Sequence, residues 1–177
     1  MFKKITIFAT CLLVALGITF WWSVAPAMAI SASNTKSTNT KAIDSYVTHY
    51  LQAKEPIALE MDNQGGVKNF SSTDLSSGKK LFEQHCLNCH VGGATLPDPT
   101  IPLSLKALQG AIPPRDNIGS IVAFLREPMT YDGTDFTYWC RQVPETWISQ
   151  TEIENLAAFV LRAAQKAPGW GATQFDL

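Results

Sequence analysis

The chain has 177 residues, of which 46% are hydrophobic and 16% are charged, and its formal net charge is −1. This length fits one domain with a modest core, and it excludes a two-domain enzyme or a bundle of membrane spans. The charge is slightly acidic and forms no basic stripe, so the sequence gives no reason to expect a nucleic-acid partner.

The first 29 residues have the pattern of a secretory signal peptide. Lys3 and Lys4 give a positive start, an apolar run follows from Ile5 to Val24, and Ala25–Ala29 closes it with two overlapping A-x-A patterns. Cleavage after Ala29 would leave 148 residues with 12 basic and 15 acidic side chains. The alternative is an uncleaved anchor, because the twenty residues of the apolar run are long enough to span a bilayer.

Residues 30–55 are predicted to form a flexible leader ahead of a single domain at 56–177. Ser31 to Ala42 contains only Ser, Ala, Asn, Thr and Lys, so it cannot bury a core. Within the leader, Ile43 to Ala53 carries apolar residues at helical spacing and predicts a marginal helix that ends before Pro56.

The domain is expected to be mostly α, with a small β-hairpin at its start. Two short apolar runs around Gly65-Gly66 predict the hairpin between Ile57 and Phe70. Gly78 and Phe82 are expected to pack the first long helix against the last. The predicted helical segments are Leu75–His85, with Ser72, Thr73 and Asp74 available as caps; one or two turns in Ser104–Gln109; Ile118–Leu125 after an Asp116 or Asn117 cap and before Pro128; and a last helix with Thr151–Glu154 as its capping box and an apolar stripe from Ile153 to Ala164.

The run Cys86-Leu87-Asn88-Cys89-His90 is the attachment signature of c-type haem. Two thiols three positions apart lie about one helical turn apart, so both can reach the vinyl groups along one side of the macrocycle. His90 then brings an imidazole to the iron as an axial ligand. A redox pair or a structural disulfide would leave His90 unused, and a zinc site would need a second pair of ligands. We therefore predict one haem c, held covalently by Cys86 and Cys89.

On the residues alone, the sixth ligand of the iron is either Met129 or Cys140. Met129 lies on a predicted loop, as the axial Met often does in c-type cytochromes. Cys140 is the odd cysteine of the exported chain, and an unpaired thiol in an oxidising compartment needs burial, a partner chain or a metal. Its other interpretation is a small buried hydrophobe. His49 and Met61 precede the haem-carrying helix and rank lower, and His85 cannot reach the distal face.

From about Pro56 to the C-terminus, the chain resembles the cytochrome c-550 family, the low-potential extrinsic cytochromes of photosystem II. The resemblance covers about two-thirds of the chain. It implies a single, mostly α c-type cytochrome domain that transfers electrons or serves as a structural haem subunit, and that is not an enzyme. It also implies a peripheral location on the lumenal side of the thylakoid membrane, beside photosystem II subunits. The motifs that carry the resemblance are Gly78–Phe82, Cys86–Gly93, Pro113–Ile118, Pro128–Gly133 and Gly169–Gly171.

The family binds haem through two axial histidines, and the first corresponds to His90. The second follows Tyr-Asp-Gly by a few residues, but here Thr134–Pro144 contains no histidine and Cys140 occupies the matching place. The resemblance therefore favours Cys140 over Met129 and describes a divergent, cytochrome c-550-like relative. A Cys140 thiolate would stabilise ferric iron and lower the potential, and reduction would favour its protonation or release. Arg141 could temper this charge, although a solvated surface side chain is the simpler interpretation.

Three functional hypotheses follow. The first is a lumenal electron-transfer or structural haem subunit of photosystem II, with an unidentified electron donor or acceptor. The second is an independent soluble low-potential carrier. The third is a haem-based redox or gas sensor in which Cys140 dissociates. An enzyme is not expected, because the sequence shows no acid–base constellation.

Overall fold

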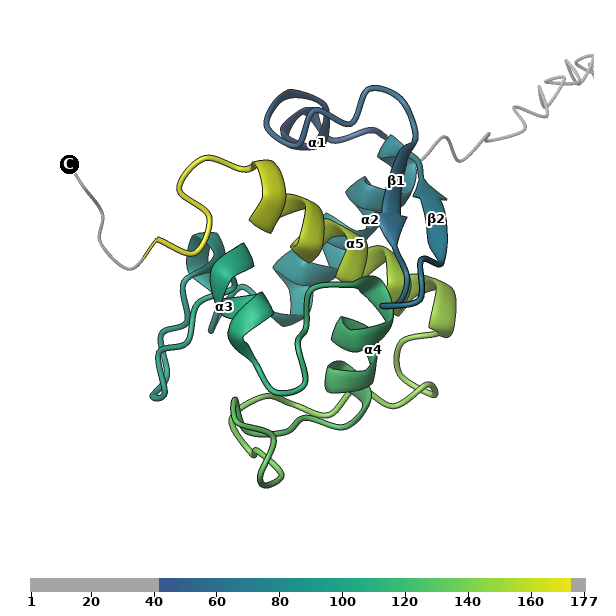
Figure 1. The fold of residues 1–177 in the computed structure, drawn as a ribbon. Helices are drawn as coiled ribbons and strands as arrows, with labels where there is room; N and C mark the ends of the chain where they lie inside the picture. The colour runs from purple at the N-terminus through teal and green to yellow at the C-terminus, as the bar shows by residue number, and fades with distance from the viewer. Residues whose placement is uncertain (1–41, 173–177) are drawn as a thin grey trace, which may run out of the picture. The chain divides into compact units, whose positions relative to one another are not determined.

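The computed structural model describes residues 42–172 (Figure 1). Within this range the chain is mostly helical and contains a two-stranded antiparallel hairpin, which confirms the predicted fold class. The signal peptide predicted at 1–29 lies outside the described residues. None of the helices in 42–172 is both long enough and apolar enough to cross a bilayer. The elements in chain order are α1 (Ser45–His49), β1 (Ile57–Glu60), β2 (Val67–Phe70), α2 (Ser72–His85), the 3-10 turn η1 (Val91–Gly93), α3 (Leu105–Gly110), α4 (Ile118–Arg126) and α5 (Gln150–Lys166).

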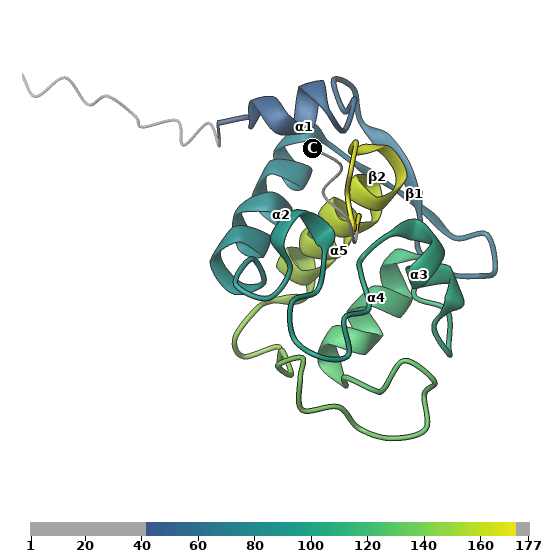
Figure 2. The same ribbon diagram turned by 90° about the vertical axis from the view of Figure 1, so that its left-hand side faces the viewer.

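The core forms where α2 crosses α5, at the centre of the molecule (Figures 1 and 2). A Cβ atom on Gly78 would lie only 1.9 Å from the carbonyl oxygen of Asn155, so only glycine permits this approach of the two helices. The rings of Phe82 and Phe159 lie 5.5 Å apart across the same crossing. The predicted packing of the first long helix on the last, through Gly78 and Phe82, is confirmed.

The segment before the hairpin belongs to the packed domain, so the prediction of a flexible leader reaching residue 55 is wrong. Lys79 of α2 donates a hydrogen bond of 2.9 Å to the carboxylate of Asp44, the N-cap of α1. Arg162 of α5 donates one of 2.8 Å to the carbonyl of Leu51. Short helices are marginal on their own, so these tertiary contacts stabilise α1 and the turn that follows it. The fully buried apolar side chains of this segment are Val47, Leu51 and Ala53.

The predicted hairpin is confirmed. β1 and β2 pair antiparallel, with Ile57 opposite Phe70 and Glu60 opposite Val67. Lys68 on β2 donates a hydrogen bond of 2.6 Å to Glu154, which ties the hairpin to α5.

Two helices begin at caps that differ from those predicted. Ser71 caps α2, because its hydroxyl accepts from the Asp74 N–H and the Asp74 carboxylate accepts from the Ser71 N–H. At α5 the pair is Ser149 and Glu152, joined by bonds of 3.1 and 2.7 Å from the Ser149 N–H and hydroxyl to the Glu152 carboxylate. The Ser/Thr-x-x-Glu pattern occurs twice here in overlapping positions, as Ser149–Glu152 and as Thr151–Glu154. The first copy forms the cap, and Glu154 of the second binds Lys68 instead.

Candidate haem site

The three residues of the C-x-x-C-H motif lie on one tight turn at the end of α2. Cys86 ends the helix, with its N–H donating to the carbonyl of Phe82 at 2.8 Å. The N–H groups of Cys89 and His90 both donate to the Cys86 carbonyl, at 3.1 and 3.0 Å. Cys89 is exposed, whereas Cys86 and His90 are half-buried. The turn therefore presents both thiols and the imidazole from one short, hydrogen-bonded segment.

A hydrogen-bond relay fixes the protonation of His90. Its Nδ1 lies 3.0 Å from Oγ1 of Thr95, and the Thr95 hydroxyl donates its only proton to the carbonyl of Ile101. Oγ1 can therefore only accept from Nδ1–H, which leaves the lone pair of Nε2 free. Burial lowers the pKa of His90 and so favours the neutral ring. A neutral imidazole with a free Nε2 is the form that ligates iron.

Cys140 lies on the long loop between α4 and α5, residues 127–149, and it is half-buried. Burial raises the pKa of Cys86 to about 12, and the charges of Cys140 and Cys89 add to the increase. Burial also raises the pKa of Cys140, whereas the positive charge of Arg115 opposes the increase. The structure thus brings the three cysteines singled out in the sequence close enough for their charges to interact.

Arg115 is the cation whose positive charge acts on Cys140. One guanidinium nitrogen, Nη2, donates to the carbonyls of Met129 and Thr130 at 3.1 and 2.7 Å, and the guanidinium carbon lies 3.9 Å from the ring centroid of Phe124. Burial lowers the pKa of Arg115, and the nearby Cys140 and Tyr131 counteract that decrease. The sequence pattern did not indicate this effect of Arg115, although the residue stands inside the Pro-Pro-Arg-Asp-Asn motif.

Arg141 is placed differently, although it follows Cys140 directly. It is exposed, and its guanidinium carbon lies 5.5 Å from the ring centroid of Trp147. The surface interpretation of Arg141 therefore fits the structure, and the positive charge that acts on Cys140 is that of Arg115.

The other candidate ligands are spread over the fold. Met129 lies near the start of the 127–149 loop, pairs through its backbone with Phe136 and is half-buried. Met61 packs against the core beside the hairpin. His85 is exposed, with its ring 5.0 Å from that of Trp147.

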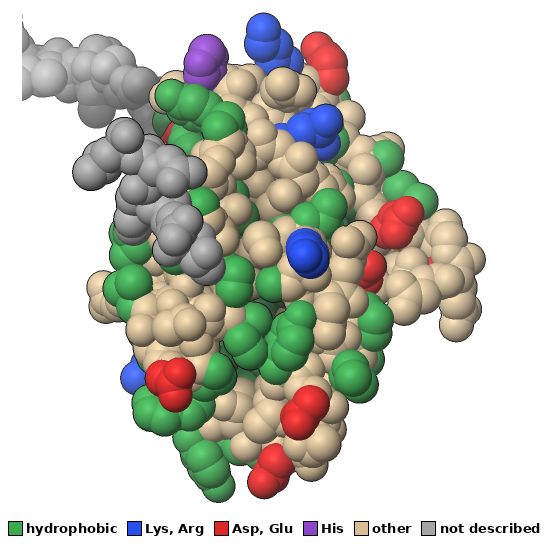
Figure 3. Space-filling model, turned by 60° about the vertical axis from the view of Figure 1, so that its left-hand side comes forward, with side chains coloured by type: hydrophobic (Ala, Val, Ile, Leu, Met, Phe, Trp, Pro, Cys, Tyr) green, Lys and Arg blue, Asp and Glu red, His purple; other side chains and the backbone are tan. Residues whose placement is uncertain are grey.

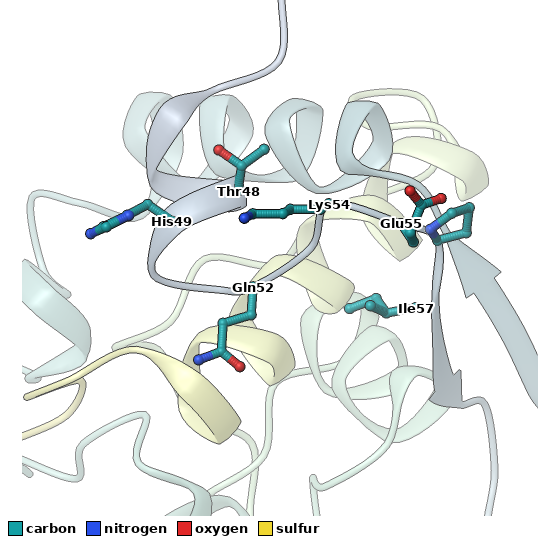
Figure 4. Close-up of a pocket in the computed structure, with 7 residues that line it drawn as sticks. Thr48, His49, Gln52, Lys54, Glu55 and Ile57 are labelled. Carbon is teal, nitrogen blue, oxygen red and sulfur yellow. The ribbon is translucent and has the colours of Figure 1, made fainter.

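His49 is exposed at the end of α1, in the wall of a separate surface hollow of about 430 Å³. Figure 4 shows its ring extending away from the neighbouring Gln52 and Lys54. The lining mixes charged, polar and apolar groups from Thr48 to Ile57 and includes neither a cysteine nor a second histidine. This hollow therefore has no donor set for haem.

Large apolar side chains gather at the surface around the C-x-x-C-H turn and the 127–149 loop. Figure 2 shows this loop running along the ends of α2 and α4, and Figure 3 shows hydrophobic side chains around a hollow on the same side of the molecule. Tyr138 and Trp139 are 91% and 69% exposed. Such concentrated apolar exposure marks a binding surface. The exposed large apolar residues of these segments are Leu87, Val91, Leu96, Phe136, Tyr138, Trp139 and Trp147.

The residues present fit a haem. Residues 42–172 contain no group of three or more His, Cys, Asp or Glu placed to hold a metal ion by themselves. The donors are instead one neutral imidazole, one thiol on the opposing loop and two thiols suited to covalent attachment. This set matches an iron that a macrocycle already coordinates, surrounded by apolar side chains.

Trp170 fixes the loop that carries the His90 relay. Its indole N–H donates to the Leu103 carbonyl at 2.9 Å, and its ring lies 5.4 Å from that of Phe82. A Cβ on Gly93, where φ is +81°, would lie 2.6 Å from the indole, so this close approach requires glycine. Trp170 therefore covers one side of the domain.

Comparisons with known proteins agree on one family. A model of the cytochrome c-550 domain matches residues 49–177. The chain is 58% identical over 130 residues to a cytochrome c-550-like protein of Trichodesmium erythraeum (strain IMS101), covering 73% of this chain and 79% of that relative. It is 50% identical over 133 residues to the photosystem II extrinsic protein V of Gloeobacter violaceus (strain ATCC 29082 / PCC 7421), covering 75% of this chain and 72% of the relative.

Solved structures show the same relationship. The fold is similar to that of the PsbV2 cytochrome from the cyanobacterium Thermosynechococcus elongatus, with a TM-score of 0.73 and 52% sequence identity, covering 74% of this chain and 100% of that one. It is also similar to cytochrome c549, with a TM-score of 0.53 and 27% identity, covering 61% of this chain and 90% of that one.

Proposed function

The chain belongs to the cytochrome c-550 family, and from this premise we propose that it is a monohaem c-type cytochrome that serves photosystem II as an electron-transfer or structural haem subunit. The observation that carries the proposal is the turn at the end of α2, where two thiols accompany a neutral His90 with a free Nε2. The name of the Gloeobacter relative supports the link to the photosystem. The same link, together with the signal peptide predicted at 1–29, supports a peripheral site on the lumenal side of the thylakoid membrane.

Within this proposal, Cys86 and Cys89 hold the haem through their thiols and His90 Nε2 is one axial ligand. Cys140 is the other axial ligand, and Met129 is the second choice. When bound, haem c supplies a one-electron ferric–ferrous couple. Cys140 is preferred because it is half-buried and interacts electrostatically with Cys86 and Cys89.

A thiolate at Cys140 would favour a low potential. A thiolate adds a negative charge at the metal, which stabilises the ferric state relative to a neutral Met ligand. Half-burial strengthens the effect, because the local field is poorly screened there. The positive charge of Arg115 makes the thiolate tolerable, and hydrogen bonds to the loop carbonyls of Met129 and Thr130 hold its guanidinium in place.

A second candidate function, a redox or gas sensor in which Cys140 dissociates, is favoured by how loosely this residue is held. Within residues 42–172, the Cys140 side chain makes a single, long hydrogen bond, 3.9 Å from Sγ to the carbonyl of the adjacent Arg141. Carbon monoxide binding to the reduced protein separates the two functions, because a carrier with a retained ligand would bind it weakly.

The test of ligation compares ferric electron-spin-resonance and optical spectra of the wild type, Cys140→Ser and Met129→Leu. We expect a low-spin thiolate-type signal that is lost in Cys140→Ser and retained in Met129→Leu. The reverse pattern would return the sixth position to Met129. The test of location is fractionation of thylakoids: retention with photosystem II supports the subunit role, and recovery as a free lumenal protein supports an independent low-potential carrier.

A further inference from the structure

We propose that Thr95 is the positioning residue of the axial ligand His90. It accepts the Nδ1 proton of His90 in a hydrogen bond, fixes the tautomer and orientation of the ring, and strengthens Nε2 as a donor to the haem iron. The inference rests on the proposed function, because it requires His90 to be an axial ligand. It assigns a specific task to a residue that neither binds the haem nor lies in the C-x-x-C-H motif.

The direction of both hydrogen bonds follows from the number of protons available. Thr95 has one hydroxyl proton, and the carbonyl of Ile101 can only accept. The contact of 3.0 Å between Oγ1 and His90 Nδ1 must therefore be donated by the ring. A carbonyl acceptor alone would also fix the tautomer, but the hydroxyl inserts a second polarised bond between ring and backbone.

The loop that carries Thr95 is held on both sides, so the oxygen has a fixed position. The next residue, Leu96, donates its N–H to the Cys89 carbonyl at 2.9 Å. Leu103 donates to the Gly93 carbonyl at 2.7 Å and closes the loop at its base. Trp170 then binds the Leu103 carbonyl from the far end of the chain. His90 and its acceptor are thus part of one hydrogen-bonded unit.

The relay strengthens His90 as a ligand. By donating to Ile101, the Thr95 oxygen becomes a better acceptor, because linked hydrogen bonds polarise one another. A stronger bond at Nδ1 moves electron density to Nε2 and raises its basicity toward the metal. A more basic imidazole favours ferric over ferrous iron, so Thr95 lowers the reduction potential in the same direction as a thiolate at Cys140.

The experiment uses the full haem-loaded chain and compares Thr95→Val, which keeps the shape, with Thr95→Ser, which keeps the hydroxyl. Spectroelectrochemistry measures the potential, and NMR of the reduced, 15N-histidine-labelled protein measures solvent exchange of the Nδ1 proton. We expect Thr95→Val to weaken the ferric preference about tenfold, the lower end of effects seen for such partners, which corresponds to a rise of about 59 mV for a one-electron couple. Its Nδ1 proton should exchange faster, and Thr95→Ser should match the wild type in both measurements.

Two results would overturn the inference while the proposed function stands: Thr95→Val matching the wild type in both measurements, or Thr95→Val and Thr95→Ser shifting equally, which would reflect loop packing alone. If Thr95→Val loads haem poorly, Thr95→Ala gives the same comparison with a smaller side chain. The proposed function fails separately if the wild-type haem shows no nitrogen coupling from labelled His90, whatever the Thr95 variants do.

Discussion

Replacing Gly78 with alanine tests the crossing of α2 and α5 on which the haem turn depends. The added Cβ would lie 1.9 Å from the carbonyl oxygen of Asn155 and 2.5 Å from its carbonyl carbon, whereas ordinary contact begins near 3.4 Å. Both obstructing atoms belong to the α5 backbone, so no side-chain rotation can relieve the overlap. The helices must therefore separate by about 1.5 Å, the difference between the 3.4 Å of ordinary contact and the 1.9 Å from the added Cβ to the Asn155 oxygen.

The expected cost follows from two opposing effects. Overpacking of a tightly packed interior destabilises a protein by about 1–3 kcal/mol, and the backbone clash places Gly78→Ala at the upper end. Alanine favours a helix over glycine by about 1 kcal/mol, which offsets part of this loss. The net loss should be about 2 kcal/mol. For a domain of this size that corresponds to a decrease in Tm of about 6–8 °C.

Thermal unfolding followed by circular dichroism measures this loss, with Lys80→Ala, an exposed change on the same helix, as the control. Because α2 ends at the Cys86 turn, Gly78→Ala should also reduce covalent haem incorporation, whereas Lys80→Ala should not. A Gly78→Ala protein as stable as the wild type would refute the reasoning, since it would show that the two helices separate at no cost.

Three further predictions concern charge, acid stability and the C-terminal tryptophan. Arg115→Gln removes the positive charge that acts on Cys140 and the bonds to two loop carbonyls, so the ferric protein should lose much of its thiolate-type signal at neutral pH. Arg141→Gln should retain the signal, and equal loss in both variants would contradict the assignment. Burial opposes ionisation of Asp44 and Glu154, but hydrogen bonds from Lys79 and Lys68 outweigh it, and the pKa of each carboxyl lies below its ordinary value of 3.8 or 4.5. The two carboxylates therefore contribute their full stabilisation above those ordinary values, and this stabilisation is lost as the pH falls through the lower pKa of the folded state. Tm should decrease below about pH 4, and it should decrease less steeply in Asp44→Asn. A Tm that is flat between pH 5 and pH 2 would argue against this contribution of the two ion pairs. Trp170→Phe keeps a ring but removes the donor to the Leu103 carbonyl, which should cost about 1 kcal/mol and speed amide hydrogen exchange in residues 93–103; unchanged exchange would show that the indole does not hold this loop.

Local sequence patterns predicted the elements whose cause is local. Apolar spacing identified the long helices, and Gly65-Gly66 identified the hairpin turn. The cap of α5 was misplaced by two residues, because two copies of the same capping pattern overlap and only the contact of Glu154 with Lys68 distinguishes them. The packing of α1 was missed for a similar reason, since it depends on side chains that are distant in sequence.

The residues of the candidate site also fall into those that a local sequence pattern can identify and those that depend on the folded chain. Cys86, Cys89 and His90 could be found from spacing alone, because the chemistry of attachment fixes their separation. Thr95 and Arg115 could not, because each acts through the folded path of a loop. Thr95 reaches His90 only when Leu96 and Leu103 close the 91–103 segment, and the charge of Arg115 acts on Cys140 only in the folded chain.

The contact between Gly93 and Trp170 has a consequence for the order in which the protein is assembled. The two residues stand 77 positions apart, and the loop beside the C-x-x-C-H turn is secured only when the indole arrives. In a chain that crosses a membrane with its N-terminus first, Trp170 emerges 77 residues after Gly93. The attachment turn would thus emerge with its neighbouring loop still open, and would acquire its final shape only after Trp170 has emerged. Truncation just before Trp170 should therefore leave a chain whose thiols can still be joined to haem, but whose His90 lacks its final orientation.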